Sequence, residues 1–319
     1  MGPSLLGQLL LNGFLATTEH SFVGKLVAYT LSLMRERLTR VWDPLVQFRL
    51  DGYNILLPLS HSLPKIRKRF PDYSANLGRI AAAIAAKDPH ARAIDIGANV
   101  GDSVAIIRAK CSMPILCIEA DAKFLTIFEK NMPLLGRDIY LFAGFVAMDT
   151  GPIVGEAIET SGTARLVPAA GDTRVNAESL EDILKRFPEF QRPRLLKSDT
   201  DGFDLPILHG ALDFLQEVKP VLFFEYDPFY LSSHGHEGLQ TLRELLRIGY
   251  SKVLVYDNFG DFLLATNLES KVLEDLHAYF SGRGAQRYMD LCLFSDDDVA
   301  LFEALHSAER TYFSTRRPT

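Results

Sequence analysis

The segment AIDIGANVGDSVAII, residues 93–107, decides the fold of this 319-residue chain. A short apolar run, typical of a buried strand, ends at Asp95, and a turn with Gly97 and Gly101 leads into a helical pattern that begins at Asp102. In an open α/β sheet, ligands bind at the carboxyl ends of the strands, and a glycine turn lets the backbone amides of the next helix approach them. The carboxylate of Asp95 suits a ligand with a cationic amino-acid portion. We therefore expect a ligand site at this turn.

A second acidic residue extends this expected site. The next apolar run, PILCIEAD at residues 114–121, contains Glu119. An acidic side chain about 20 residues beyond a glycine turn is where this kind of fold holds a ribose diol. The spacing Gly-x-Asn-x-Gly differs from the G-x-G-x-x-G of dinucleotide-binding proteins, which argues against a nicotinamide-dependent oxidoreductase. Together the turn and Glu119 predict a nucleoside ligand.

Outward from these two strands, short apolar runs alternate with longer amphipathic ones, a pattern typical of a parallel sheet flanked by helices. The sequence therefore predicts an α/β fold, doubly wound, with a mostly parallel, seven-stranded sheet. The expected strands lie at residues 92–96, 114–119, 138–143, 194–199, 220–226, 251–257 and 288–294. The expected helices lie at residues 102–111, 122–132, 177–187, 203–216 and 237–248.

Two departures from this alternation divide the chain. Residues 1–73 carry apolar helical patterns and the hairpin signal Asp51-Gly52, so we expect an N-terminal helical and hairpin extension there. The alternating domain then takes residues 74–319. Within it, residues 150–176 are rich in Gly, Pro and Thr, which predicts an inserted hairpin or loop over one edge of the sheet.

The composition is that of a folded globular protein, with 47% hydrophobic and 23% charged residues. A formal charge of -6 provides no global positive field, so we expect no nucleic-acid partner. The three cysteines are too few and too scattered for a disulfide framework, and they indicate a cytoplasmic protein with reduced thiols.

The first 40 residues are apolar but do not match a membrane span or a secretory signal. No uninterrupted apolar run reaches the roughly 18–20 residues of a transmembrane helix, and the first basic residue is Lys25. We expect amphipathic helices that pack on the main domain or on a partner chain. A homodimer through these helices and peripheral membrane contact both remain open.

The sequence resembles the FkbM family of S-adenosylmethionine-dependent methyltransferases, a branch of the class I, Rossmann-like methyltransferases. The resemblance covers roughly residues 48–300 and rests on IDIGANVGDS (94–103), IEAD (118–121), SGTARL (161–166), LEDIL (180–184) and LLKSDTDGFDLPILHGA (195–211). The last block departs from the family at Ser198, usually hydrophobic, and at Asp201 and Asp204, usually glutamates. The resemblance implies a class I methyltransferase sheet and S-adenosyl-L-methionine held by Asp95, Gly97, Asn99, Gly101, Asp102, Ser103, Glu119, Ala120 and Asp121.

A second acidic cluster follows the fourth expected strand. Asp199 comes at the carboxyl end of that strand, at the same sheet edge as Glu119, which suggests a role at the reacting centre. With Asp201 and Glu225 it would form an all-oxygen site suited to Mg²⁺ or Ca²⁺. The competing interpretation is that these carboxylates cap the next helix or pair with Lys197.

Two histidines, His234 and His236, fall in a loop after the fifth expected strand and are expected to overhang the same crevice. Either imidazole has a pKa suited to accept the proton of an attacking hydroxyl, although an ordinary polar loop explains them equally well. The resemblance implies in-line methyl transfer from S-adenosylmethionine to a hydroxyl of a small-molecule natural product or glycan acceptor. The alternative is a non-catalytic nucleoside-binding or scaffold protein of the same fold.

Overall fold

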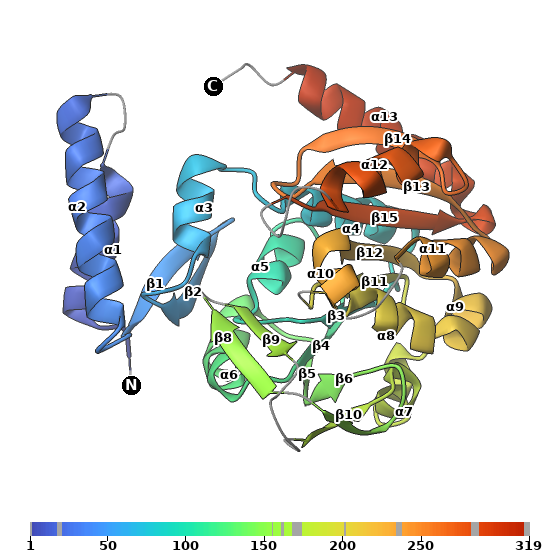
Figure 1. The fold of residues 1–319 in the computed structure, drawn as a ribbon, viewed down its shortest axis with the longest axis horizontal. Helices are drawn as coiled ribbons and strands as arrows, with labels where there is room; N and C mark the ends of the chain where they lie inside the picture. Colours follow the sequence, from blue (N-terminus) through green and yellow to red (C-terminus); the bar gives the residue numbers. More distant parts are fainter. Residues whose placement is uncertain are drawn as a thin grey trace.

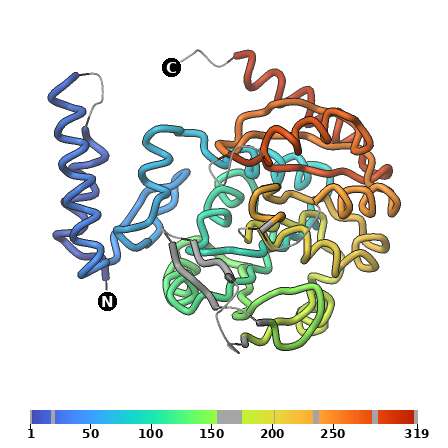
Figure 2. Tube along the Cα trace, viewed as in Figure 1, coloured from blue at the N-terminus to red at the C-terminus, as the bar shows by residue number. Residues whose placement is uncertain are grey.

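The computed structural model describes residues 2–17, 21–154, 156–160, 163–167, 174–200, 202–233, 238–281 and 287–315. Its main feature is a large sheet with helices on both faces, and a helical hairpin stands off this body at the N-terminal side (Figure 1). Figure 2 follows the chain from that hairpin, in blue, through the sheet to the last helix, in red.

The large sheet has eight strands in the order β14-β13-β15-β12-β11-β3-β4-β5. Strands β3, β4, β5, β11 and β12 run parallel, whereas β15 is antiparallel to both β12 and β13, and β14 is antiparallel to β13. All seven expected strands are present, each within one residue of its expected bounds. The strands are β3 (Ala93–Ile96), β4 (Ile115–Glu119), β5 (Ile139–Ala143), β11 (Leu195–Ser198), β12 (Val221–Tyr226), β13 (Tyr250–Asp257), β14 (Phe262–Asn267) and β15 (Met289–Ser295).

The expected count of seven strands is one too few, because β14 forms an additional edge. Its residues are half-buried or exposed, so it lacks the continuous apolar run that marks the inner strands. A tight turn joins it to β13: the Gly260 amide donates to the Asp257 carbonyl at 2.9 Å, and Gly260 has φ +85°. A half-exposed edge strand carries little periodic signal, which explains why the sequence did not reveal it.

Alternate side chains of the inner strands point into two separate cores. Ala93 and Ile115 belong to one core, whereas their neighbours Ile94 and Leu116 belong to the other. The first core is covered by α4 (Ala75–Lys87), α5 (Asp102–Arg108), α6 (Ala122–Leu135) and α13 (Val299–Thr315). The second is covered by α7 (Leu180–Leu184), α8 (Asp204–Gly210), α9 (Leu212–Val218), α10 (Pro228–Ser233), α11 (Gly238–Arg247) and α12 (Lys271–Ser281). The fold is therefore doubly wound.

Two helix predictions need correction, and some helices were missed. The helix expected at 177–187 is only α7, because Ser179 caps it: the Asp182 amide donates to the Ser179 Oγ at 3.2 Å. The helix expected at 203–216 is interrupted at Ala211, which separates α8 from α9. Helices α10, α12 and α13 were not expected.

The segment expected as an insertion, residues 150–176, contains strands, and those that the structure describes do not join the large sheet. Strand β7 lies at one edge of a small sheet of order β6-β10-β7, and β8 pairs with β9 in an antiparallel hairpin. The strands are β6 (Phe145–Val146), β7 (Gly151–Val154), β8 (Glu156–Thr160), β9 (Thr163–Val167) and β10 (Arg174–Glu178). Both small sheets appear at the lower edge of the body in Figure 1.

The N-terminal extension consists of a helical hairpin and a β-hairpin. Asp51 and Gly52 have φ values of +46° and +98°, as the Asp-Gly turn signal predicts. The fully buried Asn131 of α6 fixes the β-hairpin to the domain: its side chain accepts from the Leu56 amide at 2.7 Å and donates to the Leu56 and Val100 carbonyls, each at 2.8 Å. Within the described residues, no helix combines the length and apolarity that crossing a bilayer requires. The elements are α1 (Leu5–Ala16), α2 (Phe22–Thr39), β1 (Leu45–Leu50), β2 (Tyr53–Pro58) and α3 (Leu63–Arg69).

Candidate functional site

A cavity of about 200 Å³ lies at the carboxyl ends of β3, β4, β11 and β12, where the sequence predicted a ligand site. The segments that line it include the turn after β3, the end of β4, the end of β11 with the residues after it, the start of α3, and residues of β12 and β15. The sheet thus brings together side chains that lie far apart in the sequence.

The turn after β3 has a backbone that requires glycine at two places. Gly97 has φ +77°, and a Cβ atom there would lie 2.0 Å from the carbonyl oxygen of Asp199. Gly101 has φ +88°, and a Cβ atom there would lie 2.5 Å from the ring of Phe128. Asn99 between them also has a positive φ, +49°. The two glycines keep the turn close to β11 and α6 and leave the cavity open.

Glu119, at the end of β4, is buried but lines the cavity. Its Oε2 accepts from the Asn99 amide at 2.7 Å, and its Oε1 accepts from the amides of Ala120 and Asp121 at 2.9 and 2.8 Å. Burial raises the pKa of this carboxyl, and the three amide donors oppose that shift. The backbone therefore holds the Glu119 carboxylate rigidly at the cavity wall.

Asp95 does not reach the cavity. Its side chain is fully buried, its Oδ2 accepts from the Ser103 hydroxyl, and its Oδ1 lies 2.9 Å from the Lys197 Nζ. Ser103 and Lys197 both line the cavity in its place. Asp95, whose carboxylate was expected to contact a cationic part of the ligand, therefore positions the cavity residues Ser103 and Lys197 instead.

Lys197 lies between carboxylates at the centre of the site. Its Nζ donates to the Gly97 carbonyl at 3.3 Å and lies 3.5 Å from the Asp199 Oδ2, in addition to its ion pair with Asp95. Burial alone would lower the pKa of Lys197, but the charges of Asp95 and Asp199 outweigh it and raise the pKa. The lysine is thus a charged ammonium group.

The remaining residues of the expected cofactor set divide into two groups. Asp102 and Ala120 line the cavity, and burial raises the pKa of the Asp102 carboxyl against the opposing charge of Lys197. Asp121 instead caps α6: its Oδ1 accepts from the amides of Lys123 and Phe124, at 2.8 and 3.0 Å. It carries a structural role that the sequence motif did not distinguish from ligand binding.

Of the residues expected to act in catalysis, Asp199 lines the cavity with a side chain that is 54% exposed. His234 and His236 lie outside the described residues.

The expected metal site gains no support. Asp199 and Glu225 both line the cavity, but Asp201 lies outside the described residues. Within the part of the chain that the structure describes, no group of three or more His, Cys, Asp or Glu side chains is placed to share a metal ion.

His61, from the N-terminal extension, is a cavity residue that sequence reasoning missed. Its Nδ1 accepts from the Leu63 amide at 3.2 Å, so the Nε2 of the neutral ring carries the proton and donates to the Asn99 Oδ1 at 3.3 Å. Burial lowers its pKa, which favours this neutral form. Only the folded β-hairpin brings His61 beside the glycine turn, so no local sequence motif predicts that contact.

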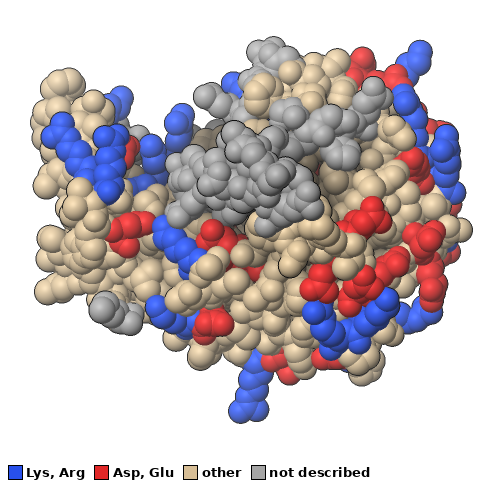
Figure 3. Space-filling view, turned by 60° about the horizontal axis from the view of Figure 1, so that its bottom comes forward, with Lys and Arg blue, Asp and Glu red and all other residues tan. Residues whose placement is uncertain are grey.

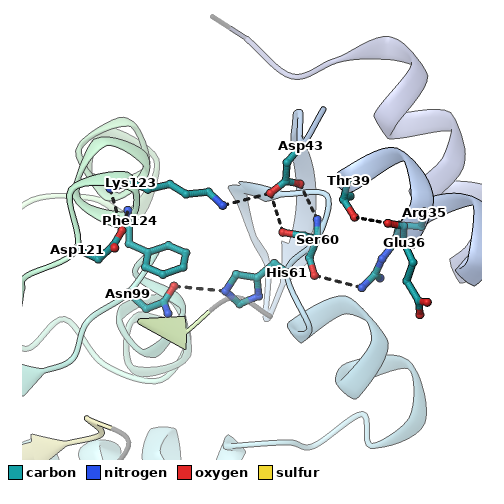
Figure 4. Close-up of polar contacts among 10 residues, drawn as sticks. All are labelled: Arg35, Glu36, Thr39, Asp43, Ser60, His61, Asn99, Asp121, Lys123 and Phe124. Atoms are coloured by element: carbon teal, nitrogen blue, oxygen red, sulfur yellow. Dashed lines mark hydrogen bonds and ion pairs between the residues drawn. The ribbon is translucent and has the colours of Figure 1, made fainter. Parts of the chain in front are cut away.

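A polar network connects His61 to the rest of the extension (Figure 4). The Ser60 amide and hydroxyl donate to the two carboxylate oxygens of Asp43 at 2.8 and 2.7 Å, and Lys123 of α6 pairs with Asp43 at 3.2 Å. The guanidinium of Arg35, on α2, donates to the Ser60 carbonyl at 3.3 Å. The extension therefore contributes both a wall of the cavity and the contacts that hold it there.

The end of the cavity away from Glu119 is acidic and aromatic. Glu225 of β12 lies opposite Asp290 of β15 in the antiparallel pairing, and both line the cavity together with Asp199. Burial and the charge of Asp199 raise the pKa of Asp290. Tyr73 and Tyr288 complete this end. Carboxylates and phenols of this kind form hydrogen bonds with hydroxyl groups.

The fold and site define a class of protein. The class I, S-adenosylmethionine-dependent methyltransferases share four features with this protein. These are five parallel strands, an antiparallel strand between β12 and β13, a glycine turn after β3, the first strand of the sheet in chain order, and an acidic residue at the end of β4, the second. Within this class, residues 95–252 match the model for the methyltransferase FkbM domain. Residues 95–252 therefore form a methyltransferase FkbM domain, as the motifs predicted.

Several solved methyltransferase structures resemble the chain at low identity. The FkbM methyltransferase of Methylobacillus flagellatus is 14% identical, with 76% of this chain aligned and a TM-score of 0.36; the chain spans only 54% of that protein. An O-methyltransferase of Bacillus cereus in complex with SAH is 10% identical over 82% of this chain and 97% of its own, with a TM-score of 0.40. A putative O-methyltransferase of Klebsiella pneumoniae is 14% identical over 72% and 87%, with a TM-score of 0.38. Among curated proteins, none matches the chain.

Proposed function

We propose that this protein is an S-adenosylmethionine-dependent O-methyltransferase that methylates a hydroxyl group of a glycan or natural-product acceptor. The observation that carries the proposal is the pairing, in one cavity, of the glycine turn after β3 with the buried carboxylate of Glu119. The match to the methyltransferase FkbM domain supports the methyl-transfer chemistry. The choice of a hydroxyl acceptor rests on the acidic end of the cavity.

The residues present fit the cofactor. The Cβ-free Gly97 leaves the turn close to Asp199, where any side chain would collide with backbone. The Glu119 Oε1 already accepts from two amides, whereas Oε2 accepts from one and retains acceptor capacity, so a ribose hydroxyl would find an acceptor in Oε2 at the cavity wall. Asn99 and Ala120 would flank the nucleoside, and Asp102 with Lys197 would hold the amino-acid portion.

When bound, S-adenosylmethionine supplies an activated methyl group on a sulfonium. The protein supplies position and proton transfer. Glu225 and Asp290 would accept hydrogen bonds from hydroxyls of the acceptor, and Asp199 would accept the proton that the attacking hydroxyl loses. Lys197, 3.5 Å from Asp199, holds that carboxylate at the cavity wall. Orienting the reactants in this way can lower a barrier by about 7–11 kcal/mol in favourable models.

The proposal is tested with methyl-labelled S-adenosylmethionine and three acceptor panels: sugar glycosides, phenolic and polyol natural products, and amines. We expect label only in hydroxyl acceptors, in products that resist alkaline hydrolysis as ethers do. Asp199→Asn should lower kcat by about 100-fold or more, the range typical of a lost general base. The exposed Asp213→Asn is the matched control and should leave kcat unchanged. Label in amines, or in alkali-labile esters, would refute O-methylation.

A further inference from the structure

The N-terminal helical hairpin exposes an unusual amount of apolar surface. Eleven of the seventeen large hydrophobic side chains exposed in the described part of the chain lie within residues 5–42. Phe22 is 81% exposed, Val23 67% and Leu9 62%. The others in this set are Leu5, Leu6, Leu26, Val27, Tyr29, Met34, Val41 and Trp42. Such a concentration marks an interaction surface rather than scattered surface residues.

The exposed side chains on α2 share one side of the helix. Ala28 and Arg35, seven residues apart, are its buried positions and mark the side that faces the protein. At about 100° per residue, the exposed Phe22, Val23 and Leu26 fall on the opposite side. On α1 the buried positions are Gly7, Leu11 and Phe14, and Leu5, Leu6 and Leu9 face solvent. Each helix therefore packs inward with one face and presents an apolar face outward, which we call the hairpin face.

The charge of this part of the chain differs in sign from the rest. Residues 1–73 contain nine Lys and Arg against five Asp and Glu, a formal charge of +4, whereas the whole chain carries -6. Lys25, Arg37 and Arg40 are exposed beside the hairpin face. In Figure 3, Lys and Arg side chains gather on the lobe at the left. An apolar face rimmed by cations is complementary to anionic lipid.

We propose that the hairpin face, made by α1, α2, Val41 and Trp42, docks on the surface of an anionic membrane. The apolar side chains would enter the interface between headgroups and acyl chains, and the exposed cations would lie among the headgroups. A second copy of the chain fits less well, because a symmetric dimer through this face would bring the exposed Lys25, Arg37 and Arg40 of one copy toward the same cations of the other.

Docking at this face would hold the cavity near the same surface. Arg35 of α2 donates to the Ser60 carbonyl, directly before the cavity residue His61. Lys68 of α3 donates to the Phe14 carbonyl of α1 at 2.6 Å. The hairpin is therefore tied by hydrogen bonds to the segment that forms one wall of the cavity.

Vesicle sedimentation of the full chain, without cofactor, tests the proposal. The vesicles are either pure phosphatidylcholine or a mixture rich in phosphatidylglycerol. We expect at least about tenfold stronger partitioning onto the anionic vesicles, since each basic residue near such a surface adds about 1 kcal/mol. The double variant Phe22→Glu with Leu26→Glu should lose at least about tenfold of that binding, because both side chains are exposed and the change does not disturb the core.

The matched control is Leu134→Glu with Leu263→Glu, which adds the same two charges at exposed leucines outside the hairpin. It should bind anionic vesicles like the unmodified protein. The proposal would be overturned if the hairpin variant bound anionic vesicles as strongly as the unmodified protein. It would also be overturned if the unmodified protein bound no vesicles, either as a monomer or as a dimer that the hairpin substitutions dissociate. Light scattering after gel filtration distinguishes the last two. Because no cofactor is added, the result is independent of methyl transfer.

Discussion

The carboxyl of Asp204, next to the cavity at the start of α8, makes the stability of the fold depend on pH. Asp204 is 1% exposed, and its Oδ1 accepts from the Ser198 hydroxyl at 2.6 Å and from the Thr200 amide at 3.1 Å. Burial, aided by the charge of Asp199, raises its pKa from 3.8 to about 6 against these two donors. In the native protein this group therefore keeps its proton to a higher pH than in the unfolded chain.

The sign and size follow from linkage. Between pH 4 and 6 the folded state binds more protons at Asp204 than the unfolded state, so this group's contribution is complete below pH 4 and is lost as the pH rises through 6. A difference of about two pKa units corresponds to about 3 kcal/mol. In Asp204→Asn the titrating group is absent, and the amide oxygen can still accept from Ser198.

Denaturant unfolding at intervals from pH 4 to pH 7 measures this effect. Relative to the unmodified protein, Asp204→Asn should gain about 3 kcal/mol of unfolding free energy between pH 4 and pH 7. Asp213→Asn, which removes an exposed carboxyl from α9, is the matched control. The two proteins are compared by their free energies of unfolding. If the difference between Asp204→Asn and the unmodified protein were the same at pH 4 and at pH 7, the proposed role of Asp204 would be refuted.

Two further variants probe the site and its support. Gly97→Ala places a Cβ atom 2.0 Å from the Asp199 carbonyl oxygen, so it should weaken S-adenosylhomocysteine binding by at least about tenfold in calorimetry. Its control is Gly136→Ala, which has a similarly positive φ of +112° but nothing within 4 Å of the new Cβ, and unchanged binding by Gly97→Ala would contradict the role of this turn. Asn131→Leu leaves two backbone groups of Leu56 and the Val100 carbonyl without their partner, so chemical denaturation should show a loss of about 2–4 kcal/mol. A loss below about 1 kcal/mol would mean that the β-hairpin is held by apolar packing alone.

The sequence predicted the inner part of the fold well for a physical reason. Strands β3, β4, β11 and β12 are buried along their whole lengths, so their sequences are rich in apolar residues and stand out from the amphipathic helices. Gly97 and Gly101 marked the turn because only glycine fits both the positive φ and the close approach of neighbouring atoms. The edge strand β14 has no such signal.

The site was predictable in position but not in the direction of each side chain. Glu119 lines the cavity at the strand end that the spacing indicated. Asp95 sits opposite Lys197 in the parallel register of β3 and β11, and that pairing turns its carboxylate away from the cavity. A contact between neighbouring strands so far apart in the chain is invisible to local pattern. The same holds for His61, whose bond to Asn99 depends on the docking of the β-hairpin.

Glu119 is the residue on which the central claim, a nucleoside held at the end of β4, depends most directly. The measurement is calorimetric titration with S-adenosylhomocysteine, with NAD⁺ as the parallel control, on the unmodified protein, Glu119→Ala and Asp121→Ala. The last variant removes a neighbouring carboxylate that caps α6 and does not line the cavity.

We predict that S-adenosylhomocysteine binds, that NAD⁺ does not, and that Glu119→Ala weakens binding by at least about tenfold, or about 1.4 kcal/mol, whereas Asp121→Ala leaves the affinity unchanged. Binding of NAD⁺ in place of S-adenosylhomocysteine, or equal affinity in Glu119→Ala and the unmodified protein, would contradict the account.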